Sequence, residues 1–282
     1  MAAPVEETVT PAHIEDLEID LLLEGMYRRF GQDFRGYRRD VVRRRLHGLM
    51  DAVGVSTVSA LQDRVMHDEA AAGALPRALC ARAAALFDEP GYFLALREKV
   101  VPLLRSSPSP KIWVAECTAA EDVGALSILL AEEGLQGKTQ IFATAADDAL
   151  LQEVRSGGFP LERWPEYAAN YRESGGKADL ADYCREENGR GVFRDELRSD
   201  VTWAQYNLAT DASFNEFQLI VCRRALRDFG TGLHRRALQL FFDSMPLFGI
   251  LSVDAEDGLR AAPVASRYKP IAQGQGLYRR VA

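Results

Sequence analysis

Residues 111–145, KIWVAECTAAEDVGALSILLAEEGLQGKTQIFATA, contain the pattern that decides the fold. A short apolar run at 112–115 is followed by an amphipathic segment at 121–133 and by a second apolar run at 141–144. Short apolar runs are typical of buried strands, whereas apolar residues three to four positions apart indicate a helix. The order strand, helix, strand predicts a parallel β-α-β unit.

The same alternation continues toward the C-terminus. Further strands are expected at 201–206, 217–222 and 248–253, with helices at 147–156 and 233–245. The closing stretch, 267–281, predicts an antiparallel pair that turns at 274–276. We therefore expect a doubly wound α/β domain over residues 111–282.

A hairpin is expected to interrupt this alternation at 178–197. Asn188-Gly-Arg-Gly191 stands there between two short runs that are able to form strands. Glycine provides the positive φ that tight hairpin turns need, so the sequence predicts a small inserted β-hairpin subdomain.

The N-terminal third has helical periodicity and no strand-like alternation. Apolar residues recur from Ile14 onward, and helices are expected at 14–30, 36–53, 56–69, 73–84 and 92–105. Residues 14–105 therefore predict a small all-helical domain, which the polar, proline-containing stretch 106–110 separates from the α/β domain. Residues 1–13 are small, acidic and proline-containing, and we expect them to be disordered.

Composition excludes several classes of protein. The chain has 282 residues, a net charge of −7 and four widely spaced cysteines without a CxxC motif. No apolar run approaches the ~18 residues of a membrane span, and the N-terminus has neither the basic start nor the apolar core of a signal peptide. The four histidines lack metal-ligand spacing, so no metal site is predicted. These features predict a cytoplasmic protein without membrane insertion.

Motifs along the whole chain resemble those of the CheR-type chemotaxis receptor methyltransferases, in the order and spacing of that family. They lie at 19–27, 31–37, 43–50, 86–90, 101–104, 112–122, 141–146, 158–163, 207–208, 221–224 and 277–279. The resemblance implies an all-helical N-terminal domain followed by a Rossmann-like methyltransferase domain dependent on S-adenosylmethionine.

The resemblance also implies an activity. Enzymes of this family transfer the methyl group of S-adenosylmethionine to glutamates of receptor helices. Four family positions that contact the cofactor keep their residues here: Glu121, Asn207, Leu208 and Arg223. No side chain is assigned a catalytic role, because direct methyl displacement needs both reactants held in line more than it needs covalent help.

Other positions depart from the family pattern. An alanine replaces the family's glycine at Ala120, its threonine at Ala84 and its ribose-binding acid at Ala145. A charged residue replaces the family's arginine at Asp88, its asparagine at Arg224 and its tyrosine at Asp228. Each lost hydrogen bond to the ligand costs about 1 kcal/mol or more, so binding of S-adenosylmethionine or S-adenosylhomocysteine is expected to be weak.

Two functions follow from these departures. The first is a CheR-like protein of chemotaxis-type signalling with weak or no methyltransferase activity, which acts by binding a partner or an altered ligand. The alternative is an active S-adenosylmethionine-dependent protein-glutamate O-methyltransferase that acts on chemoreceptors.

Residues 28–45 contain eight arginines and two aspartates. A solvated helix face explains such a run, and so does docking on an acidic helical surface of a chemoreceptor or signalling protein. The docking hypothesis assigns partner binding to Arg38, Arg39, Arg43 and Arg45. Nucleic acid is not expected as a partner, because the chain is acidic overall and no aromatic residues are interleaved with the arginines.

Overall fold

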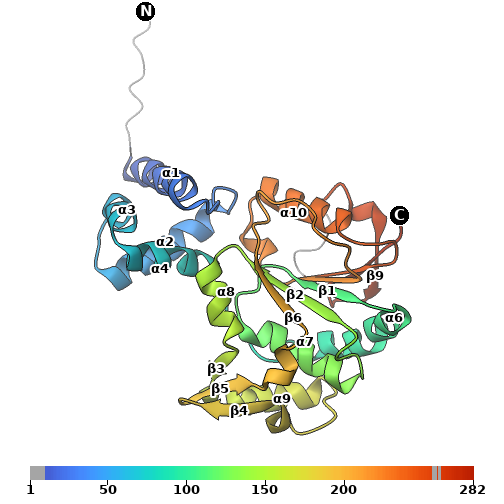
Figure 1. The fold of residues 1–282 in the computed structure, drawn as a ribbon. Helices are drawn as coiled ribbons and strands as arrows, with labels where there is room; N and C mark the ends of the chain where they lie inside the picture. The colour runs from blue at the N-terminus through green and yellow to red at the C-terminus, as the bar shows by residue number, and fades with distance from the viewer. Residues whose placement is uncertain (1–9, 256–258, 260–261) are drawn as a thin grey trace, which may run out of the picture. The chain divides into compact units, whose positions relative to one another are not determined.

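The structure is a computed structural model that describes residues 10–255, 259 and 262–282 (Figure 1). The chain forms two compact units, Met1–Cys80 and Ala81–Ala282. The prediction of a disordered segment at 1–13 falls largely on residues 1–9, which lie outside the described part. Its last residues are ordered, because the Thr10 hydroxyl oxygen accepts from the backbone N–H of His13 and caps the first helix.

The first unit is all-helical, as predicted. It consists of α1 (Pro11–Phe30), α2 (Arg39–Val53), α3 (Val58–His67) and α4 (Glu69–Cys80). Gly31 ends α1 at φ 72°, a left-handed conformation that glycine adopts without a steric penalty. The core of this unit consists of fully buried apolar side chains: Ile19, Leu22, Met26, Val42, Leu46 and Leu61.

The second unit is built on a seven-stranded sheet with the order β6-β2-β1-β7-β8-β10-β9. Its strands are β1 (Lys111–Val114), β2 (Gln140–Ala145), β6 (Val201–Gln205), β7 (Leu219–Cys222), β8 (Ile250–Val253), β9 (Tyr268–Ala272) and β10 (Leu277–Arg280). The first five are parallel and the last two form the antiparallel pair expected from the sequence. The predicted doubly wound α/β architecture is therefore confirmed.

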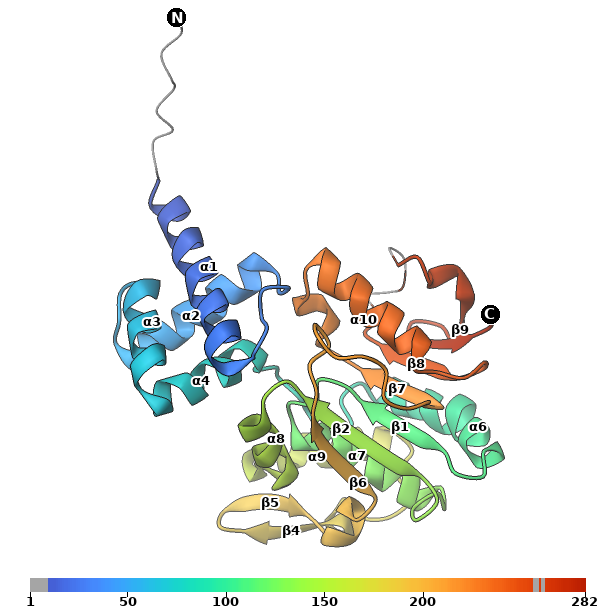
Figure 2. The same cartoon turned by 45° about the horizontal axis from the view of Figure 1, so that its top comes forward.

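Helices cover both faces of this sheet. Figures 1 and 2 show α10 (Thr231–Asp243) on one face and α7 (Ala120–Glu132) on the other. α8 (Asp148–Arg155) follows β2, and α9 (Trp164–Glu173), a helix that the sequence analysis missed, follows a 3-10 turn. At the centre of the core, the indole N–H of the fully buried Trp113 donates to the Thr144 hydroxyl at 2.8 Å.

The predicted hairpin is present and gains a third strand. β4 (Cys184–Glu187) and β5 (Arg190–Phe193) pair antiparallel across a turn in which Asn188 and Gly189 both have positive φ. β3 (Gly158–Pro160) pairs with the other edge of β5 and completes a separate three-stranded sheet.

The compact units of the structure divide at a different place from the boundary expected at 106–110. The units divide after Cys80, so the segment 81–105 belongs to the α/β unit instead of the helical domain. This segment contains α5 (Pro90–Ala95), a π-helical turn at Leu96–Val100 and the start of α6 (Val101–Ser106). Its side chains pack on the second unit: Ser252 of β8 donates to the Tyr92 hydroxyl at 2.9 Å, and Arg97 pairs with Glu133 at 2.9 Å. Helical periodicity does not reveal which core a helix joins.

Candidate functional site

The strand order creates a topological switch point between β1 and β7. From β1 the chain builds outward through β2 and β6 on one side, and later through β7 and β8 on the other. In open α/β sheets, ligands bind at the carboxyl ends of the strands beside such a point. A cavity lies there, lined by Ala85, Asp88, Tyr92, Phe93, Val114, Ala115, Glu116, Cys117, Glu121, Asp122, Leu126, Val221, Arg223 and Arg224.

The backbone around this cavity is strained. Phe87, Glu89, Glu116 and Arg224 all have φ between 53° and 66°. Each such conformation costs about 1–3 kcal/mol for a residue with a side chain, and strain of this kind clusters at functional sites. Among the described residues, only two other non-glycine positions have positive φ. The concentration of strain at one cavity supports a functional role for it.

Arg224 lines the cavity and contacts two carboxylates there. Its guanidinium pairs with Asp122 and lies 3.4 Å from Asp88, and its backbone N–H donates to Asp254 at 2.6 Å. Burial by itself lowers the pKa of Arg224, because it disfavours the charged guanidinium. The carboxylate of Asp122, and then that of Asp88, outweigh this effect, so the pKa of Arg224 is raised. With this side chain in place, water can occupy only about 30 Å³ of the cavity.

Arg223 lies beside the ring of Tyr92. Its guanidinium carbon is 4.1 Å from the ring centroid, and Glu89 holds the same guanidinium at 2.7 Å. Asp254 lies 3.8 Å away on the other side. Burial raises the pKa of Tyr92, which therefore stays neutral beside Arg223.

A second, nearly buried group of charges lies next to the cavity. The Arg82 side chain is 2% exposed, lies 2.8 Å from Asp228 and lies 3.8 Å from Glu116. Glu116 follows β1, and Asp228 belongs to a 3-10 turn after β7. The two acids at positions 116 and 228 thus have a common cationic partner within the fold.

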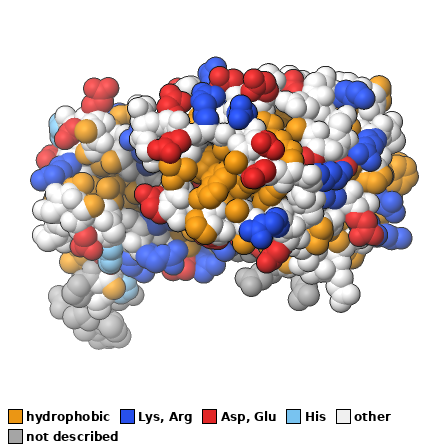
Figure 3. Space-filling view, turned by 90° about the horizontal axis from the view of Figure 1, so that it is seen from below, with side chains coloured by type: hydrophobic (Ala, Val, Ile, Leu, Met, Phe, Trp, Pro, Cys, Tyr) orange, Lys and Arg blue, Asp and Glu red, His pale blue; other side chains and the backbone are white. Residues whose placement is uncertain are grey.

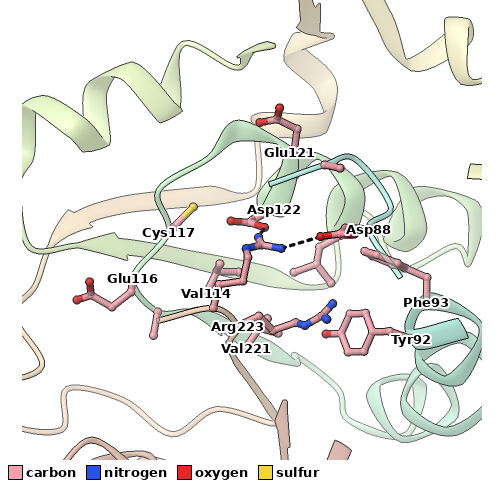
Figure 4. A pocket seen from close by; sticks show the side chains of 14 residues that line it. Asp88, Tyr92, Phe93, Val114, Glu116, Cys117, Glu121, Asp122, Val221 and Arg223 are labelled. Carbon is pink, nitrogen blue, oxygen red and sulfur yellow. Dashed lines mark hydrogen bonds and ion pairs between the residues drawn. The ribbon is translucent and has the colours of Figure 1, made fainter. Parts of the chain in front are cut away.

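The structure brings only part of the predicted contact set together. Arg223 and Glu121 line the cavity, whereas Asn207 and Leu208 do not. The Glu121 carboxylate accepts from the Tyr167 hydroxyl at 2.8 Å, and burial raises its pKa. Figure 4 shows Glu121 directed away from Arg223.

Asn207 and Leu208 have structural contacts of their own. The Asn207 side-chain oxygen accepts from the backbone N–H of Ala209 at 2.8 Å, and Leu208 is 2% exposed. The sequence analysis did not foresee Asp122 and Arg224 as direct partners. The sequence did contain a sign that Arg224 has an acidic partner. The family's arginine at position 88 is an aspartate here and its asparagine at position 224 is an arginine, so the two charge changes compensate each other.

The residue that matches the family's ribose-binding acid is Ala145. Ala145 ends β2, is 1% exposed, and its carbonyl accepts from the backbone N–H of Tyr206. The nearby Asp147 caps α8, because its carboxylate accepts from the backbone N–H of Leu150 at 2.8 Å. One oxygen of that carboxylate therefore serves the start of the helix.

The arginine face of α2 is neutralised within the helical unit. Arg43 pairs with Asp16 at 2.5 Å and with Glu15 at 3.3 Å, and Arg39 pairs with Asp16 at 3.7 Å and with Asp20. The other two predicted partner-binding side chains also have contacts in the unit: Arg38 pairs with Asp40, and Arg45 donates to the carbonyl of Leu79. Carboxylates of α1 thus already pair with Arg39 and Arg43, and the docking role of the four arginines stays a prediction.

Within the described residues, no group of histidine, cysteine and acidic side chains has the arrangement of a metal site, and no helix is long and apolar enough to cross a membrane. On the face shown in Figure 3, basic and acidic side chains are interspersed, and no basic stripe is visible.

The fold and the cavity together define a methyltransferase-fold protein with an N-terminal helical unit. The particular family follows from comparison with known families. The CheR methyltransferase SAM-binding domain matches residues 83–269, and the CheR all-alpha domain matches residues 17–80. The chain belongs to the CheR methyltransferase family. The limits of the two family domains agree with the division of the structure at Cys80.

Individual relatives are similar along most of the chain. Cher3 of Pseudomonas putida, which has a provisional methyltransferase name, is 37% identical over 265 residues, 94% of this chain and 97% of that protein. A chemotaxis protein methyltransferase of Listeria innocua is 23% identical over 86% of this chain and 92% of its own length. The solved N-methyltransferase NodS of Bradyrhizobium japonicum, in complex with S-adenosylhomocysteine, is 12% identical with a TM-score of 0.38, covering 79% of this chain and 97% of NodS.

The comparisons bear on the two functions predicted from the sequence. Family membership supports S-adenosylmethionine as the expected cofactor, because the matched domain is the SAM-binding domain of the family. None of the matches points to a loss of activity. The comparisons thus favour the methyltransferase alternative over the silent module.

Proposed function

We propose that the protein is a cytoplasmic, S-adenosylmethionine-dependent methyltransferase of chemotaxis-type signalling that modifies carboxylate side chains of a chemoreceptor. The proposed cofactor site is the cavity at the carboxyl ends of β1 and β7. The observation that carries the proposal is the contact of Arg224 with Asp88 at 3.4 Å. Because of this contact, the departures at these two positions are complementary changes within one site.

The physical meaning of this contact is a relocated positive charge. In the family pattern a guanidinium comes from position 88 and a neutral asparagine from position 224. Here the guanidinium comes from position 224 and reaches the carboxylate at position 88. The cavity therefore still contains a cation able to bind a ligand carboxylate, supplied from the end of β7.

The residues present fit the charged end of S-adenosylmethionine. Arg224 would hold its carboxylate, and Asp88 and Asp122 would face its ammonium group; the bound cofactor supplies a methyl group bonded to a sulfonium. The side chain of Arg224 must first leave Asp122, because little free volume remains while it is paired. At the ribose end Ala145 offers no side-chain acceptor, so we expect weaker binding than a complete contact set would give.

The proposed substrate is an acidic helical surface of the receptor. Arg38, Arg39, Arg43 and Arg45 remain the proposed docking side chains. The structure adds that acids of α1 already pair with Arg39 and Arg43. Docking on an acidic partner would therefore exchange one set of carboxylates for another, a small net gain that salt weakens further.

Transfer of labelled methyl groups tests the proposal. The protein is incubated with methyl-labelled S-adenosylmethionine and the cytoplasmic fragment of a chemoreceptor. The label is then counted as base-labile methyl ester. We expect label in the fragment and none in a matched fragment whose glutamates are replaced by glutamine. Absence of label from the glutamate fragment, with binding of the cofactor intact, would contradict the proposed activity.

A second function, a catalytically silent module that binds a partner or an altered ligand, is favoured by one specific observation. Ala145 is buried and its side chain has no hydrogen-bond acceptor, and the nearby Asp147 caps α8 through one carboxylate oxygen. On this account Arg224 stays paired with Asp122 and closes the cavity permanently. Soaking at millimolar S-adenosylmethionine, followed by structure determination, separates the two accounts by the position of the Arg224 side chain.

A further inference from the structure

The cavity carries an excess of negative charge. Its lining contains four carboxylates, on Asp88, Glu116, Glu121 and Asp122, against two guanidinium groups, on Arg223 and Arg224, which leaves a net charge of −2. Two further carboxylates, on Glu89 and Asp254, pair with Arg223. The positive charges of the cavity are therefore already matched by acids before any ligand enters.

Three of these acids lie nearer to solvent than the two arginines, whereas Glu116 is as buried as the arginines, with its side chain 3% exposed. The side chains of Arg223 and Arg224 are only 8% and 11% exposed. Those of Asp88 and Asp122 are 42% and 24% exposed, and that of Glu89 is 56% exposed. A ligand that approaches from solvent thus meets carboxylates first, with the guanidinium groups held behind them.

From this arrangement we infer that the cavity selects its ligand by positive charge, so that S-adenosylmethionine binds more tightly than its neutral product. The inference rests on the proposed function and names Asp88 and Asp122 as the specificity-determining residues. S-adenosylmethionine carries a sulfonium in addition to its ammonium and carboxylate groups, whereas S-adenosylhomocysteine carries an uncharged thioether. The two ligands differ by one positive charge and one methyl group.

The size of the preference follows from Coulomb's law. One uncompensated carboxylate about 8 Å from the extra charge, at an effective dielectric constant near 30, corresponds to about tenfold in affinity. The excess of −2 in the lining makes tenfold a conservative expectation. Because the exposed carboxylates are open to counterions, the preference should shrink as the ionic strength rises.

The test is a pair of calorimetric titrations on the full chain. One ligand is S-adenosylhomocysteine, and the other is sinefungin, a stable analogue whose protonated amine stands in for the sulfonium. We expect sinefungin to bind about tenfold more tightly at low salt. The ratio should be smaller at 0.5 M salt, where the Debye length is about 4 Å instead of about 30 Å at 0.01 M.

Variants assign the effect to the named residues. Asp122→Asn should reduce the sinefungin preference several-fold, and Asp88→Asn, at a more exposed position, gives a second measurement should the first variant fold poorly. Glu186→Gln is the matched control, because it removes the same charge from an exposed residue of β4 outside the cavity. The control should leave the ratio unchanged.

The outcomes are distinguishable. Equal affinities for the two ligands, or tighter binding of S-adenosylhomocysteine, would overturn the inference and leave the proposed cofactor site standing. A ratio that Glu186→Gln lowers as much as Asp122→Asn would overturn the assignment to the cavity. Failure of both ligands to bind at millimolar concentration would overturn the inference together with the proposed function.

Discussion

The ion pair between Arg224 and Asp122 allows a quantitative prediction. The perturbation is a double-mutant cycle made of Arg224→Gln, Asp122→Asn and the two changes combined. Both side chains are largely buried, at 11% and 24% exposure, so each single change leaves a charge in a poorly solvated place. In Arg224→Gln two carboxylates, on Asp122 and Asp88, face each other without the cation that joined them.

The magnitude follows from opposing effects. At a separation near 4 Å and an effective dielectric constant of about 20, the attraction of one ion pair is about 4 kcal/mol. Desolvation of two partly buried charges offsets much of this attraction. We therefore expect a coupling energy of about 2 kcal/mol, and we expect the double variant to be more stable than the sum of the single losses predicts.

Urea denaturation of the four proteins measures the coupling. The unfolding of the α/β unit is followed by the fluorescence of its tryptophans, at low and at high salt. If the two single losses add within about 0.5 kcal/mol, the residues do not interact, and the relocated-charge account fails. Arg224→Gly offers an internal check: at φ 66° glycine escapes the steric cost of a side chain, so this variant should be about 1 kcal/mol more stable than Arg224→Ala.

Three further predictions concern other parts of the molecule. Gly124→Ala in α7 should lower the free energy of unfolding by about 1–2 kcal/mol, because its methyl carbon would lie 2.2 Å from the ring of Phe193 and crowding outweighs the gain in helix propensity. Burial raises the pKa of Glu121. The stability of the protein relative to Glu121→Gln should therefore be greatest at acidic pH and fall as pH rises through the raised pKa. A pH series of thermal melts of the two proteins measures this difference. Reversing Arg39 and Arg43 to glutamate should lower the melting temperature of the helical unit by about 4 °C or more, since carboxylates of α1 would face them, and circular dichroism follows this change.

Two of these predictions have a matched control variant. Gly48→Ala, also inside a helix but with nothing within 4 Å of the added methyl carbon, should stabilise the protein by about 0.5–1 kcal/mol. Reversal of the exposed Arg44 should leave the melting temperature nearly unchanged. Three results would refute the corresponding arguments. The first is an unchanged free energy of unfolding in Gly124→Ala, and the second is a stability difference between the protein and Glu121→Gln that does not change with pH. The third is an equal melting temperature for the Arg39 and Arg43 double reversal and for Arg44→Glu.

The sequence predicted the strands and helices of the sheet because their patterns are local. The runs at 112–115 and 141–144 are apolar on both faces, as buried parallel strands must be. The boundary after Cys80 was missed because α5 and α6 are amphipathic in the same way as the helices of the N-terminal unit. Contacts with residues distant in the chain, such as that of Tyr92 with Ser252, 160 positions later, assign them to the other core.

The site was harder to predict than the fold. Taken one at a time, each departure from the family pattern predicts a lost contact with the cofactor. Asp88 and Arg224 compensate only because the fold places them 3.4 Å apart, and no local pattern encodes that distance. Glu121 was predicted to contact the cofactor. Its carboxylate accepts a hydrogen bond from the hydroxyl of Tyr167, which lies on a helix that the sequence analysis missed.

The central claim is that the cavity at the ends of β1 and β7 binds S-adenosylmethionine with Arg224 as the partner of its carboxylate. Calorimetric titration of S-adenosylmethionine into the protein and into Arg224→Gln tests it most directly. The account predicts saturable binding with a Kd of about 100 μM for the protein and at least about tenfold weaker binding for the variant. No saturable binding by the protein at about 2 mM ligand, or equal affinity in the two proteins, would contradict it.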